Sequence, residues 1–555
     1  MLELKHSRKE LQETTLRSFR KYMPRLSGVV TLIILASCTS TSFQFTDSKV
    51  VEKYPDDHPI PVPVKNEFEP ISYRYDVLVR RPLIKGLDVS KIERARDVNS
   101  MDNVPASSWF TPRLGFENIS PERLLRGPEK IGPPELPIKV VKAKTLGGNP
   151  GFIIKDARGH MYLTKFDPPD FPAIETTTAL IVNRMYWGFG YNVPEDYLFY
   201  FRERDLHIDP AGELKKADVK NVLSMVVPPE NGIYRSTVSL FVKGIILGPV
   251  ADKGTRKNDF NDKIAHENRR VLRALRVFNA FTNHSNMRID NSLDVYVGEP
   301  GHGYVKHYLL DFGEAFAGHA AGHNYLWDGF SHIFSFGDVM KNFVTAGMWV
   351  KNWENLEYTK WRSIGPFESG IYSPAGWKEV YPYHPIRNCR PEDAYWAAKI
   401  LSALTDEHIR ALVDAAQYPE EDAAEYMIKT LIERRDKTLR YFLSLVSPLE
   451  LVKIEKKQLV FEDQGSKIFG ETGSPPNYGI SFFDKKGRQI KQIAETRVQE
   501  EKLFISLTDH VLNQARGYFR ITILSNHSRS SSCNPAEFHF RIDKNAAVNL
   551  VGVVH

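Results

Sequence analysis

The chain has 555 residues, of which 42% are hydrophobic and 26% are charged, so it can form about three domains with apolar cores. Its formal net charge of +6 is small for this length, and seven of its basic residues lie within the first twenty-five positions. The rest of the chain is nearly balanced in charge, so composition predicts no nucleic-acid partner.

The basic start leads into a short apolar segment, residues 29–35, which is too short to span a membrane as a helix. The segment ends in Leu35-Ala36-Ser37-Cys38, which resembles a bacterial lipobox. The resemblance implies cleavage before Cys38, acylation of Cys38 and a membrane-anchored, extracytoplasmic lipoprotein of the cell envelope. Because Thr39 follows the cysteine, it implies the outer membrane in a Gram-negative cell. An ordinary secretory signal with an incidental cysteine, or a weak membrane anchor, is the alternative.

Residues 1–38 are thus predicted to be a signal peptide, and no later segment has eighteen consecutive apolar residues. Residues 39–136 are predicted to be a tether and an N-terminal extension, since residues 39 to about 70 are rich in Ser, Thr, Pro and charge. The loop from Asp97 to Phe110 ends in Trp109 and Phe110, whose rings we expect to anchor it in a neighbouring core. A ligand-binding loop is the alternative.

Residues 137–250 carry alternating strand patterns, at 138–141, 152–155, 161–166, 197–201 and 237–242. The first two strands are separated by Gly147-Gly148-Asn149-Pro150-Gly151. Glycines allow backbone N–H groups to approach phosphates closely, although this cluster is not G-x-G-x-x-G.

Lys165 stands in the third predicted strand and points inward with Leu163 in the alternating pattern. A lysine on an inward face requires a partner. A helix predicted to begin at Pro172 carries Glu175, so we expect Lys165 and Glu175 to pair. A purely structural ion pair is the alternative.

Residues 251–447 are predicted to begin with a solvated loop, 251–262, and a helix from about 266 to 281. The helix leads into Asn286-Met287-Arg288-Ile289-Asp290-Asn291. A strand, a glycine-rich turn and a second strand then lead to Asp311-Phe312-Gly313.

The spacing Asn286-x-Arg288-x-x-Asn291 is similar to the D-x-K-x-x-N catalytic loop of kinases, and Asp311-Phe312-Gly313 is similar to their DFG turn. With Lys165 and Glu175 in the expected order, residues 138–446 resemble the protein-kinase-like fold. The nearest likeness is to atypical branches: HipA-type toxin kinases, spore-coat CotH-type kinases and phosphatidylinositol kinases.

This resemblance implies a bilobal core that binds ATP and Mg²⁺ between its lobes and transfers a phosphoryl group. By the resemblance, Lys165 holds phosphates, Glu175 orients Lys165, Asn291 and Asp311 hold the metal, and Arg288 stabilises charge. Backbone groups of the glycine loop would complete the nucleotide site, at Gly147, Gly148 and Gly151.

Asn286 occupies the position of the catalytic base, and an amide has no useful basicity near neutral pH. Phosphoryl transfer depends mostly on positioning and electrostatics, so a slow enzyme remains one alternative, with His284 standing in as base; Asp290 points along the wrong register. The favoured hypothesis is a degenerate kinase-like core that binds a nucleotide, because ATP is scarce outside the cytoplasm. A third hypothesis is an envelope scaffold without ligand.

His319 and His323 lie four residues apart but lack the glutamate of H-E-x-x-H, so they are expected to be structural. From Pro391 to Leu445 the pattern predicts three helices, with Thr405 as an N-cap and the charged run 433–437 on an exposed side. Cys389 and Cys533 lie in different predicted domains, and no bond between them is indicated.

Residues 448–555 alternate as short strands, at 458–462, 478–483, 502–507, 518–523 and 538–542. This spacing predicts a small all-β sandwich, a module that we expect to bind an envelope protein partner. The predicted fold class is therefore α+β: a bilobal kinase-like core with a β-rich N-lobe and a helical C-lobe, followed by the sandwich.

Overall fold

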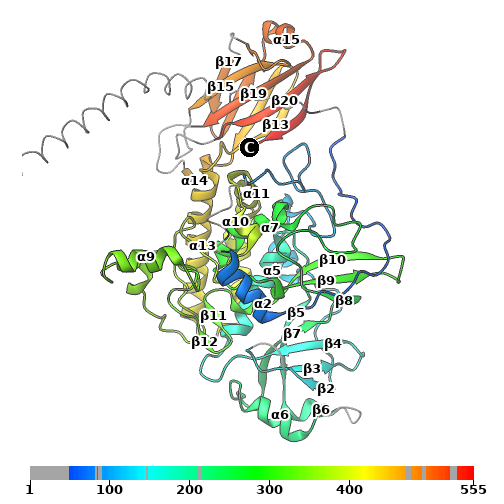
Figure 1. The fold of residues 1–555 in the computed structure, drawn as a ribbon, viewed down its shortest axis with the longest axis vertical. Helices are drawn as coiled ribbons and strands as arrows, with labels where there is room; N and C mark the ends of the chain where they lie inside the picture. Colours follow the sequence, from blue (N-terminus) through cyan, green and yellow to red (C-terminus); the bar gives the residue numbers. More distant parts are fainter. Residues whose placement is uncertain are drawn as a thin grey trace, which may run out of the picture.

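The computed structural model describes residues 45, 49–81, 84, 91–144, 148–208, 214–469, 477–490, 495–525 and 534–555. Cys38, Gly147 and Cys533 lie outside these residues. Within them the predicted mixture of helices and sheets is confirmed (Figure 1). No helix in this part of the chain is both long and apolar enough to cross a membrane.

The segment 49–70 is not the free tether that its composition predicts. Asp56 and Ile60 are buried, at 2% and 4% exposure. Ser108 donates from its N–H and its hydroxyl to the Asp56 carboxylate at 3.0 and 2.7 Å, and Ile60 N donates to Gly303 O at 2.9 Å. The segment is therefore fixed along the core by buried contacts, and it leads into α2 (Pro70–Tyr75) and η1 (Asp76–Arg80).

The loop that ends in Trp109 and Phe110 is anchored as predicted. Phe110 is fully buried and Trp109 is 5% exposed. The Trp109 ring stacks on the His307 ring, with 3.5 Å between centroids. The loop leads into β1 (Arg113–Glu117) and α4 (Pro121–Arg126).

A six-stranded sheet follows, in the order β5-β7-β4-β3-β2-β6. Its strands are β2 (Ile138–Ala143), β3 (Phe152–Lys155), β4 (Met161–Lys165), β5 (Asp196–Phe201), β6 (Leu206–Ile208) and β7 (Tyr234–Leu240). All neighbouring pairs are antiparallel except β2 and β6. Apolar side chains of one face join those of α6 (Lys216–Leu223) in a buried cluster.

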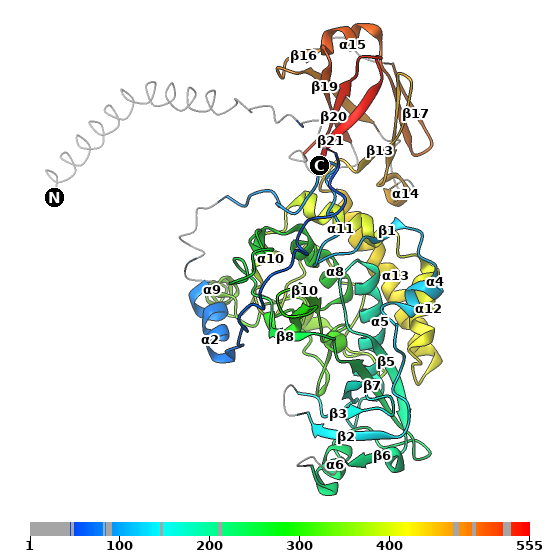
Figure 2. The same ribbon diagram turned by 90° about the vertical axis from the view of Figure 1, so that its right-hand side faces the viewer.

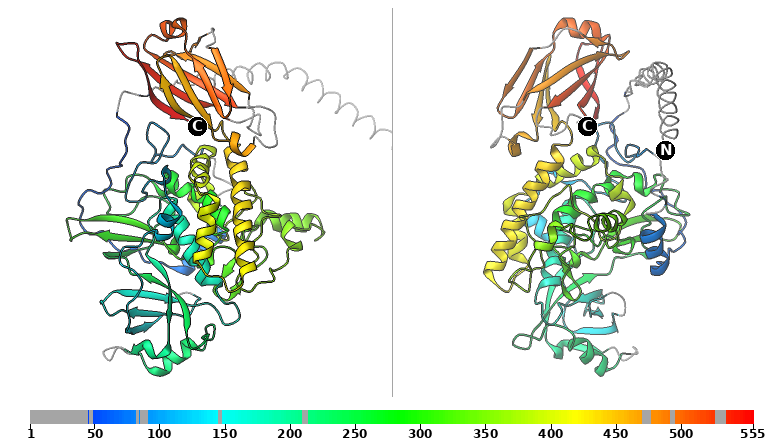
Figure 3. Two further views of the ribbon diagram at one scale, coloured as in Figure 1. Left: turned by 180° about the vertical axis from the view of Figure 1, so that it is seen from behind. Right: turned by 60° about the vertical axis from the view of Figure 1, so that its left-hand side comes forward.

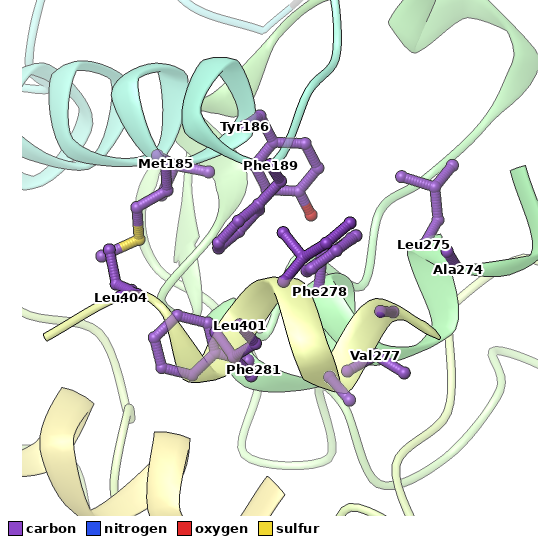
Figure 4. Packing of buried hydrophobic residues seen from close by; sticks show 14 of the residues in the cluster. Met185, Tyr186, Phe189, Ala274, Leu275, Val277, Phe278, Phe281, Leu401 and Leu404 are labelled. Atoms are coloured by element: carbon purple, nitrogen blue, oxygen red, sulfur yellow. The ribbon is translucent and has the colours of Figure 1, made fainter. Parts of the chain in front are cut away.

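Helix α5 (Ile174–Gly188) packs against β5 and β7 and continues into the helical part of the molecule (Figure 2). It begins at Ile174 rather than at Pro172, because the Asp167 carboxylate accepts hydrogen bonds from the N–H groups of Glu175 and Thr176 at 2.8 and 2.9 Å. These bonds satisfy two of the free donors at the helix start. At the other end, Phe189 stacks on Phe278 at 4.2 Å in the main apolar core (Figure 4).

The single helix predicted over 266–281 is divided into η3 (His266–Asn268), α7 (Arg270–Arg273) and α8 (Leu275–Thr282). The three predicted later helices are present as α11 (Pro391–Ser402), α12 (Asp406–Ala415) and α13 (Glu421–Leu443). Thr405 is the N-cap of α12, accepting from His408 N at 3.3 Å. The remaining helices here are α9 (Phe336–Val344) and α10 (His384–Arg387).

A three-stranded sheet joins β8 (Ile245–Gly248), β9 (Ser292–Val297) and β10 (Tyr304–Leu309), and β8 was not predicted. The segment 251–262, predicted to be solvated, instead buries charged side chains. Asp262 accepts from Arg269 at 2.6 Å and lies 2.7 Å from His266 Nε2. Charged side chains that form ion pairs with each other can be buried, even in a segment whose composition is polar.

Arg434 contradicts the prediction that the run 433–437 lies on an exposed face. Its side chain is buried, and its guanidinium donates to the carbonyls of Phe281 and Ala280 at 2.9 and 2.8 Å. The same group lies 3.6 Å from the centroid of the Tyr372 ring. Helix α13 is therefore joined to α8 by a buried cation.

The last residues form two antiparallel sheets at one end of the molecule (Figure 3). Side chains from both sheets share one buried cluster. The four-stranded sheet contains β13 (Leu449–Glu455), β14 (Gln458–Asp463), β18 (Lys502–Ser506) and β17 (Glu495–Gln499). The five-stranded sheet contains β16 (Gln489–Ile490), β15 (Tyr478–Asp484), β19 (Tyr518–Ser525), β20 (Ala536–Ile542) and β21 (Val548–Val554). The strands β13, β16, β17 and β21 and the helices α14 (Ser466–Phe469) and α15 (Asp509–Ala515) were not predicted.

Candidate functional site

Three charged residues from three separate elements meet beside the six-stranded sheet. Lys165, at the end of β4, places its Nζ 3.6 Å from Glu175 Oε1 on α5. The same Nζ forms an ion pair with the carboxylate of Asp311, in the turn after β10. The Lys165 side chain is 15% exposed and that of Glu175 only 1%. The structure thus brings together the lysine, the helix glutamate and the DFG aspartate.

Strand β4 sends alternate side chains to opposite faces of the sheet. Tyr162 and Thr164 are buried, and Tyr162 belongs to the apolar cluster on the α6 side. Lys165 therefore lies on the other face, toward α5, where its ammonium group is compensated by carboxylates rather than placed in an apolar core.

The electrostatics of this cluster favour cations. Burial raises the pKa of Glu175 to about 7, with Lys165 opposing the shift. Lys165 lowers the pKa of Asp311. Glu314 adds a third carboxylate, and the charges of Asp311 and Glu314 both raise the pKa of Glu175.

The DFG turn is held directly against α5. Asp311 adopts the left-handed conformation, with φ of 62°, and Phe312 is buried against the Tyr186 ring at 5.0 Å between centroids. A Cβ on Gly313 would lie 2.0 Å from Glu175 Oε1. Only glycine can therefore occupy this position while the Glu175 carboxylate stays beside Lys165.

Replacing Gly313 by Ala is expected to displace Glu175 and the turn, and so to weaken the binding of any ligand that depends on Lys165 and Asp311. Overpacking of this kind costs typically about 1–3 kcal/mol of stability. Chemical denaturation would measure the loss. Gly301→Ala is the matched control, because a Cβ there meets nothing within 4 Å, although its φ of 83° adds backbone strain. Equal losses in the two variants would contradict a specific Gly313–Glu175 contact.

The catalytic-like loop is tied to the same turn. Asn291 ends η4 (Ile289–Asn291), is 2% exposed, and donates from Nδ2 to Asn286 O at 2.8 Å. Leu310 N donates to Asn291 O at 2.9 Å, directly before Asp311. The amide of Asn286 donates to the carboxylate of Glu314.

The other loop residues have structural partners. Arg288 Nε lies 3.2 Å from Asp290 Oδ1, and the Arg288 guanidinium lies 5.8 Å from the Tyr381 ring centroid. His284 is 1% exposed, and burial lowers its pKa to about 4. A neutral buried imidazole with so low a pKa is poorly matched to a general base at neutral pH.

The described glycines of the loop before β3 have different surroundings. A Cβ on Gly148 would lie 2.7 Å from Ala320 Cβ, so Gly148 packs directly onto the hairpin after the DFG turn. A Cβ on Gly151 would lie 2.1 Å from Thr164 O. Close packing against β4 is therefore sufficient to account for glycine at position 151.

His319 and His323 lie in that hairpin, on the short paired strands β11 (Gly318–His319) and β12 (Gly322–His323), and not on a helix. The His323 ring stacks on Tyr358 at 5.4 Å. Among the described residues no three or more His, Cys, Asp or Glu side chains are grouped to hold a metal ion.

Two residues of the site were missed in the sequence. Asp167, two residues after Lys165, fixes the start of α5. Glu314, the residue directly after the DFG turn, contacts Asn286. Asp167 stands seven residues before the helix start at Ile174, so the usual capping pattern, which places an acidic residue directly before the helix, does not indicate it. For Glu314 its place after the glycine was the only signal.

No family model and no curated protein matches the chain. Among solved structures, the Helicobacter pylori proinflammatory kinase CtkA is similar over 55% of this chain and 98% of its own, with 12% identity and a TM-score of 0.27. The twitchin kinase region of C. elegans is similar over 74% of this chain and 75% of its own, with 10% identity and a TM-score of 0.20. Both neighbours are kinases, but likenesses at these TM-scores carry no argument about this chain.

Proposed function

We propose that this chain is a membrane-anchored, extracytoplasmic lipoprotein whose bilobal, kinase-like core binds ATP together with Mg²⁺. The observation that carries the proposal is the meeting of Lys165, Glu175 and Asp311. These residues come from a strand, a helix and a turn, and Lys165 and Asp311 are 146 residues apart. Their order and geometry are what a kinase requires to position phosphates.

In this proposal Lys165 holds the phosphates and Glu175 orients Lys165. Asp311 and Asn291 supply oxygen ligands for Mg²⁺, which is usually held by one or two carboxylates together with substrate phosphates and water. Glu175, which is 1% exposed, and Asp311 share the single ammonium group of Lys165, and this excess of negative charge supports a bound cation here. Gly148, in contact with Ala320, would cover the phosphates from the other side.

The anchoring part of the proposal rests on residues 29–38 of the sequence. Phe45 N donates to Tyr518 Oη at 3.2 Å, and a Cβ on Gly552 would lie 2.2 Å from the Phe45 ring. Seven residues span at most about 25 Å, so an acylated Cys38 would hold the C-terminal unit close to the membrane. There this unit, in our proposal a β-sandwich, would meet an envelope protein partner.

Thermal unfolding of the full chain in detergent micelles tests the nucleotide site. ATP with Mg²⁺ at one hundred times its dissociation constant is expected to stabilise the chain by about 2.7 kcal/mol. Asp311→Ala should abolish the shift, and Asp436→Ala, in an ion pair on α13, should retain it. No shift at millimolar ATP and Mg²⁺ would contradict nucleotide binding and favour the scaffold hypothesis.

A further inference from the structure

We propose that Glu314 is the proton acceptor for phosphoryl transfer in this site, in the place where the catalytic loop has Asn286. This inference rests on the proposed nucleotide site and adds to it that the bound nucleotide is turned over. It also assigns the acceptor a chemical class, a hydroxyl group or water, because these are the acceptors that need such a base.

The position of Glu314 follows from two fixed elements. Its backbone is in η5 (Phe312–Glu314), which Phe312 and Gly313 hold against α5. Its carboxylate accepts from the Asn286 amide, and Asn286 is held through its carbonyl by Asn291 at 2.8 Å. The carboxylate thus stands at the end of the side chain that occupies the base position, with an amide orienting it.

The other candidate bases around this point are occupied. Asp311 and Glu175 face Lys165, and Asp290 faces Arg288 at 3.2 Å. His284 is buried among aromatic rings, 6.0 Å from Phe312 between centroids. Asp328 is buried and accepts hydrogen bonds from Asn283 and Ser285. Among the described residues, Glu314 is the carboxylate that accepts from the Asn286 amide.

The charges around Glu314 are compatible with a base. Burial and the Asp311 carboxylate raise its pKa, while Asn286, Arg288 and Lys165 lower it. The charge of Glu314 in turn raises the pKa of Glu175 and of Asp328. A carboxylate with a raised pKa is a better proton acceptor near neutral pH.

The proposed step is balanced as follows. The acceptor oxygen forms a bond to the γ-phosphorus of ATP, and the bond from that phosphorus to the β,γ-bridging oxygen breaks. ADP leaves with the bridging oxygen, and the proton of the acceptor hydroxyl passes to the Glu314 carboxylate. Asn286 keeps its hydrogen bond to that carboxylate and takes no proton.

The experiment exchanges the amide of Asn286 and the carboxylate of Glu314, the two groups of one hydrogen bond. Phosphate release from ATP, with water as the acceptor, is measured for the full chain in detergent with Mg²⁺. Glu314→Gln should lower the rate by about 10²–10³-fold, because a positioned base contributes about 10²–10⁴-fold. The double variant Asn286→Asp with Glu314→Gln restores a carboxylate and an amide to the pair and should recover to within about tenfold.

Two controls separate this inference from folding and from binding. Glu425→Gln, in an exposed ion pair with Arg410, should leave the rate unchanged. The thermal shift with ATP and Mg²⁺ should be the same in wild type and Glu314→Gln. If Glu314→Gln fails to fold, the rate of phosphate release of the double variant is compared with that of Asn286→Asp alone.

Three outcomes would overturn the inference. One is a Glu314→Gln rate within threefold of wild type. Another is a wild type that shows the thermal shift but releases phosphate no faster than Lys165→Ala. That result would leave a nucleotide-binding pseudokinase and contradict only the role of Glu314 as a base. An absent thermal shift in wild type would remove the nucleotide site and the base together.

Discussion

Replacing Arg270 by Met is expected to lower the free energy of unfolding by about 3–5 kcal/mol, the usual effect of removing one partner from a buried ion pair. Arg270 is fully buried at the start of α7. Its guanidinium donates to Asp393 of α11 at 2.9 Å and to the Asp102 carboxylate at 2.8 Å. Without it, two carboxylates that are 0% and 2% exposed lose their common cation.

The loss would extend to the packing of the C-terminal unit. Asp102 also accepts from Arg94 at 2.6 Å, and its carboxylate lies 3.0 Å from His555 Nδ1. Burial opposes the charge of Asp102, yet Arg270 and His555 lower its pKa. Arg273, 3.2 Å from Asp393, and Arg94 would each still compensate one of the two acids, but the cation that joins the two acids would be lost.

Urea denaturation of Arg270→Met measures this effect. Arg410→Met is the matched control, since its ion pair with Glu425 is more than half exposed and such substitutions change stability by less than about 0.5 kcal/mol. A loss below about 1 kcal/mol in Arg270→Met would show that the network around Asp102 does not hold the helical part together.

Replacing Lys165 by Met is expected to weaken ATP binding by at least about 100-fold, equivalent to about 2.7 kcal/mol. Methionine keeps much of the length and volume but removes the cation that faces Asp311 and Glu175. Burial disfavours the charged form of Lys165, but Asp311 and Glu175 outweigh burial and raise its pKa. In the variant, the phosphates of ATP would face only the carboxylates of Asp311 and Glu175.

Lys429→Met, on the exposed side of α13, is the control for this prediction, because the Lys429 side chain is 76% exposed and its ammonium lies 3.9 Å from Glu433. It should bind ATP as wild type does. Equal affinities of Lys165→Met and wild type would mean that the lysine serves only as a structural partner of Asp311.

The elements that carry Lys165, Glu175 and Asp311 could be predicted from short local patterns, whereas the meeting of all three in one site was implied by the resemblance to kinases. Lys165 ends an alternating strand, Glu175 lies in the first turn of a helix, and Asp311 follows a second alternating strand. Local hydrophobic periodicity reports these elements directly. The contact between Glu314 and Asn286 could not be predicted in this way, since it depends on how the turn docks on α5.

Residues whose burial depends on distant charges were also mispredicted. The segment 251–262 is polar in composition, but Arg256 pairs with Asp294 and Asp262 with Arg269 in the interior. Arg434 belongs to a charged run that predicts a solvated face, but in the structure its guanidinium donates to carbonyls of α8. Composition indicates the chemical type of a side chain, whereas its partner is set by the tertiary fold.

Edge strands were the elements most often missed. All residues of β17 are exposed, and its sequence lacks the apolar alternation of its neighbour β18. A strand that pairs only along one side and buries no side chain leaves little trace in hydrophobic periodicity.

Direct binding of radiolabelled ATP to the full chain, by equilibrium dialysis with and without Mg²⁺, tests the central claim. We predict one saturable site per chain that requires Mg²⁺ and is lost in both Lys165→Met and Asp311→Ala. Binding that survives both substitutions, or no binding at millimolar ATP with Mg²⁺, would contradict a nucleotide site at Lys165 and Asp311.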